Sequence, residues 1–252
     1  MNSFRFKKKI VGFGSSKFRF KPLMTGKVSN SGRNVTSVIV TRGRSSGVKS
    51  NYFSIDYSRI WTKKLAVSIN LLKYPKKSSF ISLIKYSNGT FSYILASSTL
   101  KPGDLTLSTA LPIMFLIKIG DVACNVLLKY VSYTSLFFNI ELLVGSGGKY
   151  ARSAGTFCRL LSVNLNKDII KISLPSGVVK IVSQYCMVTL GRSSNLLHSK
   201  QFLVKAGYYR NLGFKSKVRG VAMNPIDHPH GGRTKTNSPE LTPWGKIAKI
   251  NK

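Results

Sequence analysis

Acidic residues are scarce in this sequence. Asp and Glu number 7 against 40 Lys and Arg, so the 252 residues carry a formal net charge of +33 at pH 7. Like charges at this density repel one another and oppose a compact state unless a polyanion neutralises them. A surface that is merely cationic and solvated is the alternative, but protein surfaces usually mix both signs. The imbalance therefore predicts a nucleic-acid partner.

Cysteines and long apolar runs are scarce as well. Cys124, Cys158 and Cys186 lie far apart among apolar or β-forming neighbours, and their spacing fits neither a disulfide framework nor a zinc knuckle. We interpret them as small buried hydrophobes in a reducing compartment. The best apolar run, residues 111–117, ends at Lys118, far short of the roughly 20 residues that span a bilayer. The sequence thus predicts no metal, no cofactor and no membrane span.

The first 49 residues form a basic segment without a single acid. Twelve Lys and Arg alternate there with five Phe side chains, a composition typical of an arm whose cations meet phosphates while its rings pack against bases. A targeting presequence shares the basic, acid-free composition, and a disordered tail is a further alternative. The rings, together with Pro22 and the glycines that interrupt an amphipathic helix, favour the RNA-binding arm.

From about residue 51 the sequence turns to short β-branched and aromatic runs separated by turn signals, the pattern of small all-β barrels. Asn88-Gly89 and Ser176-Gly177 each predict a hairpin turn between two such runs. Beyond about Gly191 the strand pattern fades into an extension typical of a chain threaded through RNA. The expected strands cover residues 80–86, 90–95, 116–119, 125–133, 157–164, 169–174 and 178–182. The expected division is a basic arm at 1–49, barrels at 50–111 and 112–191, and an extension at 192–252.

A glycine-rich loop at residues 145–150 reads GSGGKY and looks at first like a phosphate-binding loop. Its spacing before Lys149 is too short, Tyr150 replaces the required Ser or Thr, and no helix follows. These departures argue against a nucleotide site. Amide groups of a glycine-rich turn can still hold RNA phosphates, with Lys149 and Arg152 beside them.

A second cluster at residues 224–232 reads NPIDHPHGG and places two histidines one residue apart. A metal site is one interpretation, but Pro229 restricts the backbone and no Cys or further His lies nearby. A general-base pair of Asp227 and His228 is another, because imidazole titrates near neutrality, although adjacent side chains do not normally face each other. Positioned contacts to RNA are the interpretation we favour.

Residues 218–232, which read VRGVAMNPIDHPHGG, and residues 242–246, which read TPWGK, closely resemble the C-terminal signature of the universal large-subunit ribosomal protein two family. The resemblance extends to residues 145–156 (GSGGKYARSAGT), 103–104 (GD), 93–96 (YILA), 55–57 (IDY) and 31–34 (SGRN). It therefore covers most of the chain, though weakly before Phe80.

The resemblance implies an all-β fold with an oligonucleotide-binding-type (OB-fold-like) barrel, then an SH3-like barrel, and long irregular basic N- and C-terminal extensions. It implies a structural constituent of the large ribosomal subunit, not an enzyme, that binds rRNA, supports assembly of the peptidyl transferase centre and helps the subunits associate. The implied partners are large-subunit rRNA and neighbouring ribosomal proteins, with no small-molecule substrate, and any structural magnesium would belong to the rRNA. The expected rRNA-binding residues are Arg33, Arg42, Arg44, Lys49, Gly147, Gly148, Lys149, Arg152, Ser153, Arg219, Asn224, Asp227, His228, His230, Arg233, Trp244 and Lys246.

The sequence departs from the family pattern at two places. Residues 42–49 read RGRSSGVK where the family usually has RHxGGGHK, and RTKT at 233–236 replaces the usual GEGR. The signatures persist while their surroundings drift, and Ser, Asn, Lys, Ile, Phe and Tyr are frequent, as AT-rich coding produces. This combination favours a mitochondrial ribosomal protein in the matrix, with a plastid or a bacterial cytoplasm as the alternatives.

Two other functions agree with parts of the sequence. A ribonucleoprotein enzyme would use Asp227 and His228 for acid–base chemistry, and a free single-stranded nucleic-acid module would use the barrel around Phe80. Seven widely spread acids disfavour a converging catalytic pocket, and a free module leaves both basic extensions without a role. The ribosomal interpretation accounts for the whole pattern.

Overall fold

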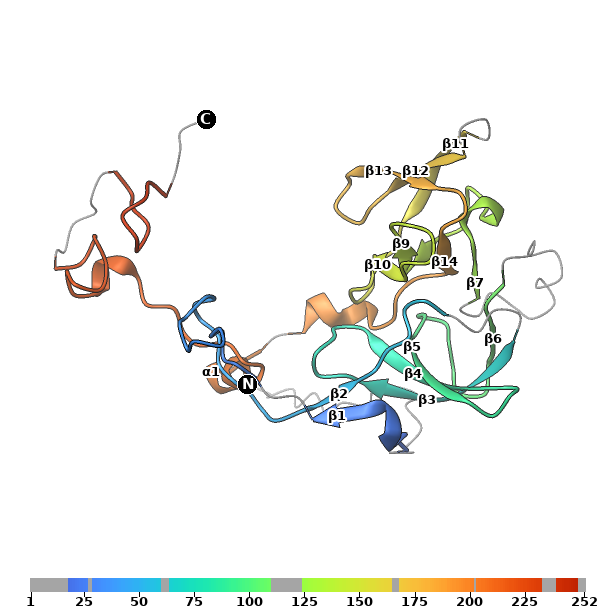
Figure 1. The fold of residues 1–252 in the computed structure, drawn as a ribbon, viewed down its shortest axis with the longest axis horizontal. Helices are drawn as coiled ribbons and strands as arrows, with labels where there is room; N and C mark the ends of the chain where they lie inside the picture. Colours follow the sequence, from blue (N-terminus) through green and yellow to red (C-terminus); the bar gives the residue numbers. More distant parts are fainter. Residues whose placement is uncertain are drawn as a thin grey trace, which may run out of the picture. The chain divides into compact units, whose positions relative to one another are not determined.

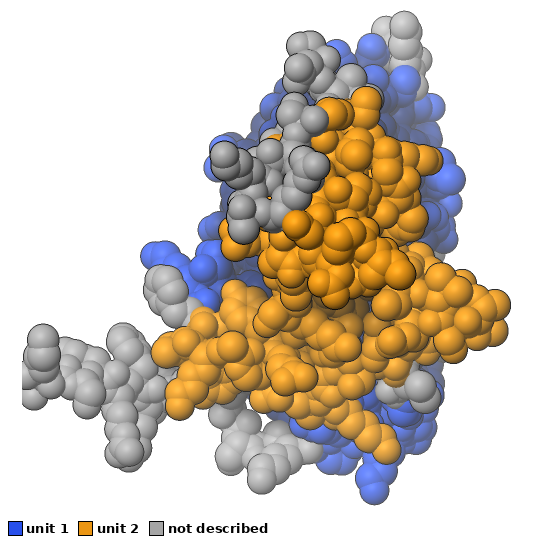
Figure 2. Space-filling view, turned by 90° about the vertical axis from the view of Figure 1, so that its left-hand side faces the viewer, with its two compact units in different colours: residues 1–27, 50–202 blue, residues 28–49, 203–252 orange. Residues whose placement is uncertain are grey.

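The computed structural model describes residues 18–26, 29–59, 64–109, 124–164, 168–201, 203–232 and 239–248 (Figure 1). Contacts within the chain divide it into unit 1, residues 1–27 and 50–202, and unit 2, residues 28–49 and 203–252 (Figure 2). The strand expected at 116–119 lies outside the described residues, and the four-part division made from the sequence stays a prediction. Within the described residues, no helix has the length and apolar character needed to cross a membrane.

The first barrel of unit 1 is an antiparallel sheet in the order β5-β4-β3-β6, extended at the β5 side by the pair β1-β2 through a bridge between Ile55 and Tyr93. Asn88-Gly89 makes the turn between β4 and β5, where Gly89 has a φ of 83°, so the predicted hairpin is confirmed. Its elements are η1 (Lys21–Leu23), β1 (Met24–Gly26), β2 (Asn51–Phe53), β3 (Leu65–Lys73), β4 (Phe80–Tyr86), β5 (Phe91–Leu95) and β6 (Leu105–Leu107).

Aromatic packing fills the first barrel. Phe53 lies edge-on to Tyr74 and to Tyr93, with ring centroids 5.1 Å apart in both pairs. Edge-to-face pairs of this kind add about 0.5–1.5 kcal/mol beyond the burial of apolar area. The Tyr93 hydroxyl accepts a hydrogen bond from the Phe20 N–H (2.8 Å), so this core also fixes the chain that leads into β1.

The second barrel is built from the sheets β7-β14-β8 and β11-β12-β13 and the pair β9-β10, with Phe137 bridged to Cys158 between the sheets. Gly177 has a φ of 85° at the turn between β12 and β13, as predicted. Its elements are β7 (Asn125–Leu127), η4 (Leu128–Tyr130), β8 (Phe137–Phe138), β9 (Ile140–Glu141), β10 (Gly148–Tyr150), β11 (Arg159–Asn164), β12 (Ile169–Ser173), β13 (Val179–Ser183) and β14 (Met187–Leu190). The all-β class, with an OB-fold-like barrel before an SH3-like one, is confirmed.

The strand expected at 125–133 is wrong beyond Leu127. The chain turns there into η4, in which the Val131 N–H donates to the Leu128 carbonyl (3.2 Å). Leu128 is fully buried and its N–H donates to the Cys186 carbonyl (2.9 Å), whereas Lys129 is exposed. A continued strand would also place Leu128 on the buried face of Val126, so the apolar pattern of the sequence does not distinguish the turn from a strand here.

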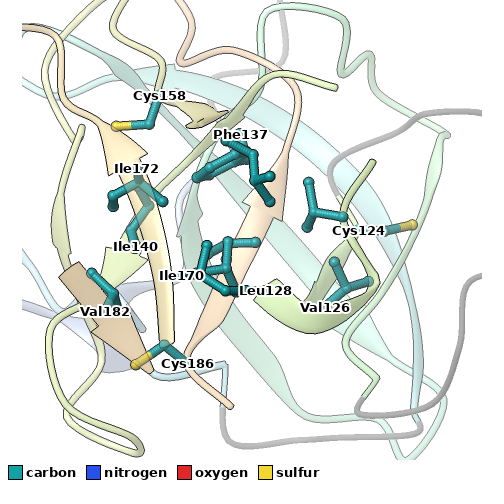
Figure 3. Packing of buried hydrophobic residues seen from close by; sticks show 13 residues of the cluster. Cys124, Val126, Leu128, Phe137, Ile140, Cys158, Ile170, Ile172, Val182 and Cys186 are labelled. Atoms are coloured by element: carbon teal, nitrogen blue, oxygen red, sulfur yellow. The ribbon is translucent and has the colours of Figure 1, made fainter. Parts of the chain in front are cut away.

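All three cysteines are buried in or beside this second core (Figure 3). Cys124, Cys158 and Cys186 lie among aliphatic and aromatic side chains, and burial raises the pKa of the Cys158 thiol to about 12. Because the thiolate is the reactive form, such a thiol is inert near neutral pH. The interpretation of the cysteines as small buried hydrophobes agrees with these positions.

The described part of unit 2 consists of loops and turns with two short helical elements, α1 (Ala206–Asn211) and η7 (Gly220–Ala222). Among its described residues only Gly213 and His228 are buried, and every hydrophobic cluster found in the described residues belongs to unit 1. As far as its residues are described, unit 2 therefore lacks the apolar core that normally supplies the main stabilising term of a fold.

Glu141 organises the glycine-rich loop from inside the second barrel. Its side chain is 2% exposed, and its two carboxylate oxygens accept hydrogen bonds from the backbone N–H groups of Gly145 (3.2 Å), Gly147 (2.9 Å) and Met187 (3.0 Å). Backbone amides that converge in this way bind an anion. In this chain the anion is a side chain of the protein itself.

Glu141→Gln tests this arrangement. The amide would turn an NH2 donor toward the converging N–H groups, so we expect the free energy of unfolding to fall by about 1–3 kcal/mol. Asp104→Asn is the matched control, because Asp104 accepts the Lys101 N–H in a half-exposed turn, where a smaller loss is expected. Denaturant unfolding of the full chain, followed by circular dichroism, measures both; equal losses would show that Glu141 has no special structural role.

Candidate nucleic-acid interface

A cationic pocket lies in unit 1 where the two barrels meet. Lys76 and Lys77 come from the turn between β3 and β4, whereas Lys149 and Arg152 come from β10 and the loop after it. Ser153 also contributes to the lining, which contains no Asp or Glu among the described residues. Four cations without a compensating carboxylate make this pocket suited to a phosphate.

Hydrogen bonds between the barrels fix this pocket. Ser79 Oγ donates to the Arg152 carbonyl (3.1 Å), the Ala154 N–H donates to Ser78 Oγ (3.0 Å), and Asn195 Nδ2 donates to the Ser78 carbonyl (2.6 Å). The turn before β4 is thus tied to the loop after β10 at several points. The cations from the two barrels are positioned together before any ligand arrives, which lowers the entropic cost of binding.

Two of these cations, Lys77 and Arg152, make cation–π contacts with the Tyr57 ring. The Arg152 guanidinium carbon lies 4.7 Å from the ring centroid and Lys77 Nζ lies 5.6 Å from it. Burial, and after it the charge of Arg152, lowers the pKa of Lys77. A phosphate in the pocket would offset this repulsion and favour the charged amine.

The glycine-rich loop was expected to offer its backbone N–H groups to RNA phosphates, but in the structure these groups already have partners within the protein. Residues 148–150 form strand β10, and the N–H groups of Gly145, Gly147 and Gly148 are bonded to Glu141 and to the Tyr57 carbonyl. These amides would have to exchange partners before they could hold RNA phosphates. Lys149 and Arg152 still line the cationic pocket, so their side chains are the groups of this segment that remain candidates for binding phosphate.

Gly148 has a packing role that the sequence did not show. A Cβ built on it would lie 2.1 Å from Asn139 Oδ1 and 2.5 Å from Asn139 Cγ, and Asn139 is itself buried. Real atoms do not approach this closely, so a side chain at this position disturbs the barrel. A side chain at Gly148 therefore forces the buried Asn139 side chain to move, whatever Gly148 contributes to binding.

In unit 2, the loop at 220–232 closes around the His228 ring. His228 is 8% exposed, and a Cβ built on Gly220 would lie 2.7 Å from its Cε1 atom. A Cβ on Gly231 would meet the Asn224 carbonyl at 2.3 Å, and one on Gly232, where φ is +74°, would meet Pro225 at 2.6 Å. The glycines of the signature are thus needed for close contact within the loop.

The two histidines are linked to each other and to the C-terminal turn. The His230 N–H donates to His228 Nδ1 (3.0 Å), and the Leu241 N–H donates to His230 Nε2 (2.8 Å). Each of these ring nitrogens acts as an acceptor, so the neutral His228 carries its proton on Nε2 and the neutral His230 on Nδ1. The histidine pair is part of the framework of unit 2.

The catalytic and metal interpretations of this cluster gain no support from the geometry. Asp227 is exposed, and no hydrogen bond joins it to His228 in the described part of the chain. No group of at least three His, Cys, Asp or Glu side chains comes together as metal ligands in the described residues either. His228 Nδ1 instead accepts a hydrogen bond from the His230 N–H. An Asp partner would need a proton on this nitrogen, so the observed bond leaves no place for such a pair.

The other expected site residues lie on the surface of unit 2. Arg42 lies over the Trp244 ring, and Arg44 lies over the ring of Phe214, which the sequence analysis did not single out. The remaining exposed members of the expected set are Arg33, Lys49, Arg219, Asn224 and Lys246. Arg233 lies outside the described residues. Whether these side chains contact rRNA stays a prediction.

Lys76, Lys77 and Tyr57 were also missed from the sequence. Lys76 and Lys77 follow Tyr74-Pro75, just before the strand that the sequence predicts at residues 80–86. Paired cations in a turn next to a predicted RNA-binding sheet are a usable signal. Their convergence with Arg152 depends on contacts between segments more than 70 residues apart, such as that of Ser79 with Arg152, and no local pattern encodes it.

Comparison with known proteins gives consistent matches over most of the chain. The family model for the Ribosomal Proteins L2, RNA binding N-terminal domain, matches residues 20–108, and the model for the Ribosomal Proteins L2, C-terminal domain, matches residues 121–245. The large ribosomal subunit protein uL2 of Rhodopseudomonas palustris (strain BisB18) is 41% identical over 235 residues, which are 92% of this chain and 82% of that protein. The uL2 protein of Rhodospirillum centenum is 37% identical over 92% of this chain and 83% of its own length. The uL2 protein of Paracoccus denitrificans is 39% identical over 91% of this chain and 80% of its own length.

Proposed function

The chain belongs to the ribosomal protein L2 family, and from that premise we propose that it serves as an rRNA-bound scaffold beside the peptidyl transferase centre of a mitochondrial ribosome. It is a structural constituent of the large ribosomal subunit, and its N-terminal domain is of an RNA-binding type. The place near the centre, the help in joining the subunits and the mitochondrial compartment are parts of the proposal. The alphaproteobacterial relatives support the last of these.

One observation carries the scaffold function. The cations of the pocket, Lys76, Lys77, Lys149 and Arg152, converge from both barrels on a lining without acids among the described residues, while the buried carboxylate of Glu141 is engaged by backbone amides. Positive side chains that are positioned in advance and not neutralised by a carboxylate of the pocket bind the phosphates of a folded RNA. In this arrangement the protein fixes RNA geometry and supplies no chemical step.

The histidine loop supports a scaffold role near the centre. His228 is held by Gly220 on one side and by the His230 N–H on its Nδ1 atom. A general base needs a free acceptor nitrogen within hydrogen-bond reach of a reacting group. His228 has Nε2–H left as a donor, which suits a hydrogen bond to an RNA oxygen or base acceptor.

Incorporation into large subunits tests the rRNA-binding role. Lys149→Gln removes one phosphate contact from an exposed position of the pocket, so we expect subunits that lose the protein at lower salt during sucrose-gradient washing. Removal of one phosphate contact lowers the slope of log affinity against log salt by about 0.7–0.9. Lys101→Gln, an exposed cation outside the pocket, is the control. Wild-type protein that washes off intact subunits at moderate salt would contradict the proposal.

His228→Gln separates scaffold from catalyst. We expect fewer assembled or joined subunits but near-normal single-turnover peptide-bond formation, with an unchanged pH profile, in the particles that do assemble. Gly220→Ala should reproduce the assembly defect while keeping the imidazole, because its Cβ displaces the ring. A rate loss of about a hundredfold or more in fully assembled His228→Gln particles would instead indicate acid–base catalysis.

A further inference from the structure

Two basic segments that are far apart in the sequence pair directly within unit 2. Residues 43–48 of the arm and residues 211–215 of the extension, which we call the clasp, share three backbone hydrogen bonds. The Ser45 N–H donates to the Gly213 carbonyl (2.9 Å), the Val48 N–H to the Asn211 carbonyl (2.9 Å), and the Lys215 N–H to the Gly43 carbonyl (3.0 Å). Residues 43–48 and residues 211–215 are therefore joined directly through their backbones.

Glycine is required on both sides of the clasp. A Cβ built on Gly47, where φ is +67°, would lie 2.8 Å from the Asn211 carbonyl oxygen and 2.9 Å from the Gly213 nitrogen. A Cβ on Gly213, where φ is +94°, would lie 3.1 Å from the Ser45 carbonyl oxygen. Any other residue at Gly47 would push the two backbones apart.

The clasp and the C-terminal turn bring arginines of the arm over aromatic rings of the extension. The Arg42 guanidinium carbon lies 5.1 Å from the centroid of the Trp244 ring, and that of Arg44 lies 4.8 Å from the centroid of Phe214. Trp244 is nevertheless 71% exposed. Since a ring this exposed cannot be covered on both faces, the face away from Arg42 is open.

The turn that carries Trp244 is fixed by its own sequence. The Gly245 N–H donates to the Thr242 carbonyl (2.9 Å), Pro243 occupies the second position of the turn, and Gly245 has a φ of 76°. Pro at the second position and Gly at the fourth favour this type of turn. Trp244 thus projects from a turn of restricted conformation, which lowers the entropic cost of stacking.

Unit 2 carries a large excess of positive charge, which favours a polyanionic partner. Fourteen Lys and Arg fall in residues 28–49 and 203–252, against Asp227 and Glu240. Lys217 lies against Gly43, since a Cβ on that glycine would be 3.2 Å from its Cε atom, so a further cation joins the arginines at the clasp. An open aromatic face beside several cations is the arrangement that binds single-stranded nucleic acid.

Resting on the proposed function, we propose that the clasp and the Trp244 turn form a composite site for single-stranded RNA, in which an unpaired base stacks on the open face of Trp244. Arg42 holds the other face of the ring, and Arg42, Arg44 and Lys217 hold the flanking phosphates. A base inside a duplex is stacked on its neighbours and cannot reach the ring, so the site selects unpaired nucleotides. Neither segment makes the site alone, because the arm supplies the arginines and the extension supplies the ring.

Tryptophan fluorescence of the full chain tests the site. The chain has two tryptophans, so Trp61→Phe leaves Trp244 as the single reporter. We expect an unstructured oligouridylate to quench this signal, and a duplex RNA of equal charge or heparin to quench it far less. Trp244→Leu, followed by anisotropy of labelled oligouridylate, should weaken binding about 5-fold to 150-fold, the usual effect of losing one stacked base.

Matched alanine variants test whether the site is composite. In the Trp61→Phe background, Gly47→Ala opens the clasp while Trp244 and every cation are kept, so the quenching should be lost. Gly207→Ala is the same chemical change in the same unit, with no atom within 4 Å of the new Cβ. In this control, oligouridylate should quench the Trp244 fluorescence as much as in the Trp61→Phe parent. Arg42→Lys keeps the charge but loses the planar group over the ring, and intermediate quenching is expected.

The outcomes separate this inference from the ribosomal function. Quenching that persists in Gly47→Ala would show that Trp244 binds without the clasp and would overturn the composite site. Equal quenching by heparin and oligouridylate would overturn base stacking. Binding of labelled RNA with an unchanged Trp244 signal would reject this site and leave rRNA binding intact, whereas absence of any RNA binding would contradict the proposed function itself.

Discussion

Mutual repulsion among 40 Lys and Arg, with only 7 Asp and Glu, is the constraint on which the rest of this structure depends. The chain uses four of its acids to organise its own backbone. Asp56 accepts the N–H groups of Ser58 and Arg59, Asp104 accepts that of Lys101, Glu141 accepts three further N–H groups, and Asp168 accepts the Gln184 side-chain amide. Carboxylates engaged with N–H groups leave neighbouring cations available to RNA.

The two units meet this constraint in different ways. Unit 1 buries two substantial hydrophobic cores and places its cations at the rim, notably around the pocket that contains Lys149 and Arg152. Unit 2 has only Gly213 and His228 buried among its described residues, and it relies on glycine-dependent backbone contacts and on arginines over rings. Such a unit gains little from burial. Its order is expected to come from RNA, which removes the repulsion and covers the exposed rings.

The sequence predicted the all-β class and the local turns. Asn88-Gly89 and Ser176-Gly177 specify their hairpins through residues that adopt positive φ at no steric cost, which is a local property. The sequence did not identify β3, the longest strand among the described residues, because Ser68 and Asn70 are buried while Leu65 and Val67 are exposed. This reversal hides the usual alternation of apolar and polar residues.

The candidate site was predictable only in part, because it depends on contacts between segments that are distant in the sequence. The cations and glycines could be named individually, but the insertion of Glu141 under the glycine-rich loop depends on contacts made by the fold. The pairing of residues 43–48 with 211–215 joins segments separated by the whole of both barrels. Glycines in a basic segment predict a loop, but they do not indicate which distant backbone comes close.

Hydrogen exchange of the full chain, free in solution and within purified large subunits, tests most directly whether RNA supplies the order of unit 2. The account predicts that amides in the middle of β4, at Leu83 and Ile84, are protected in both states. The clasp amides of Ser45, Val48 and Lys215 should exchange near the unfolded rate in the free protein and slow markedly in the subunit. Clasp amides that exchange as slowly as those of β4 in the free protein would contradict it.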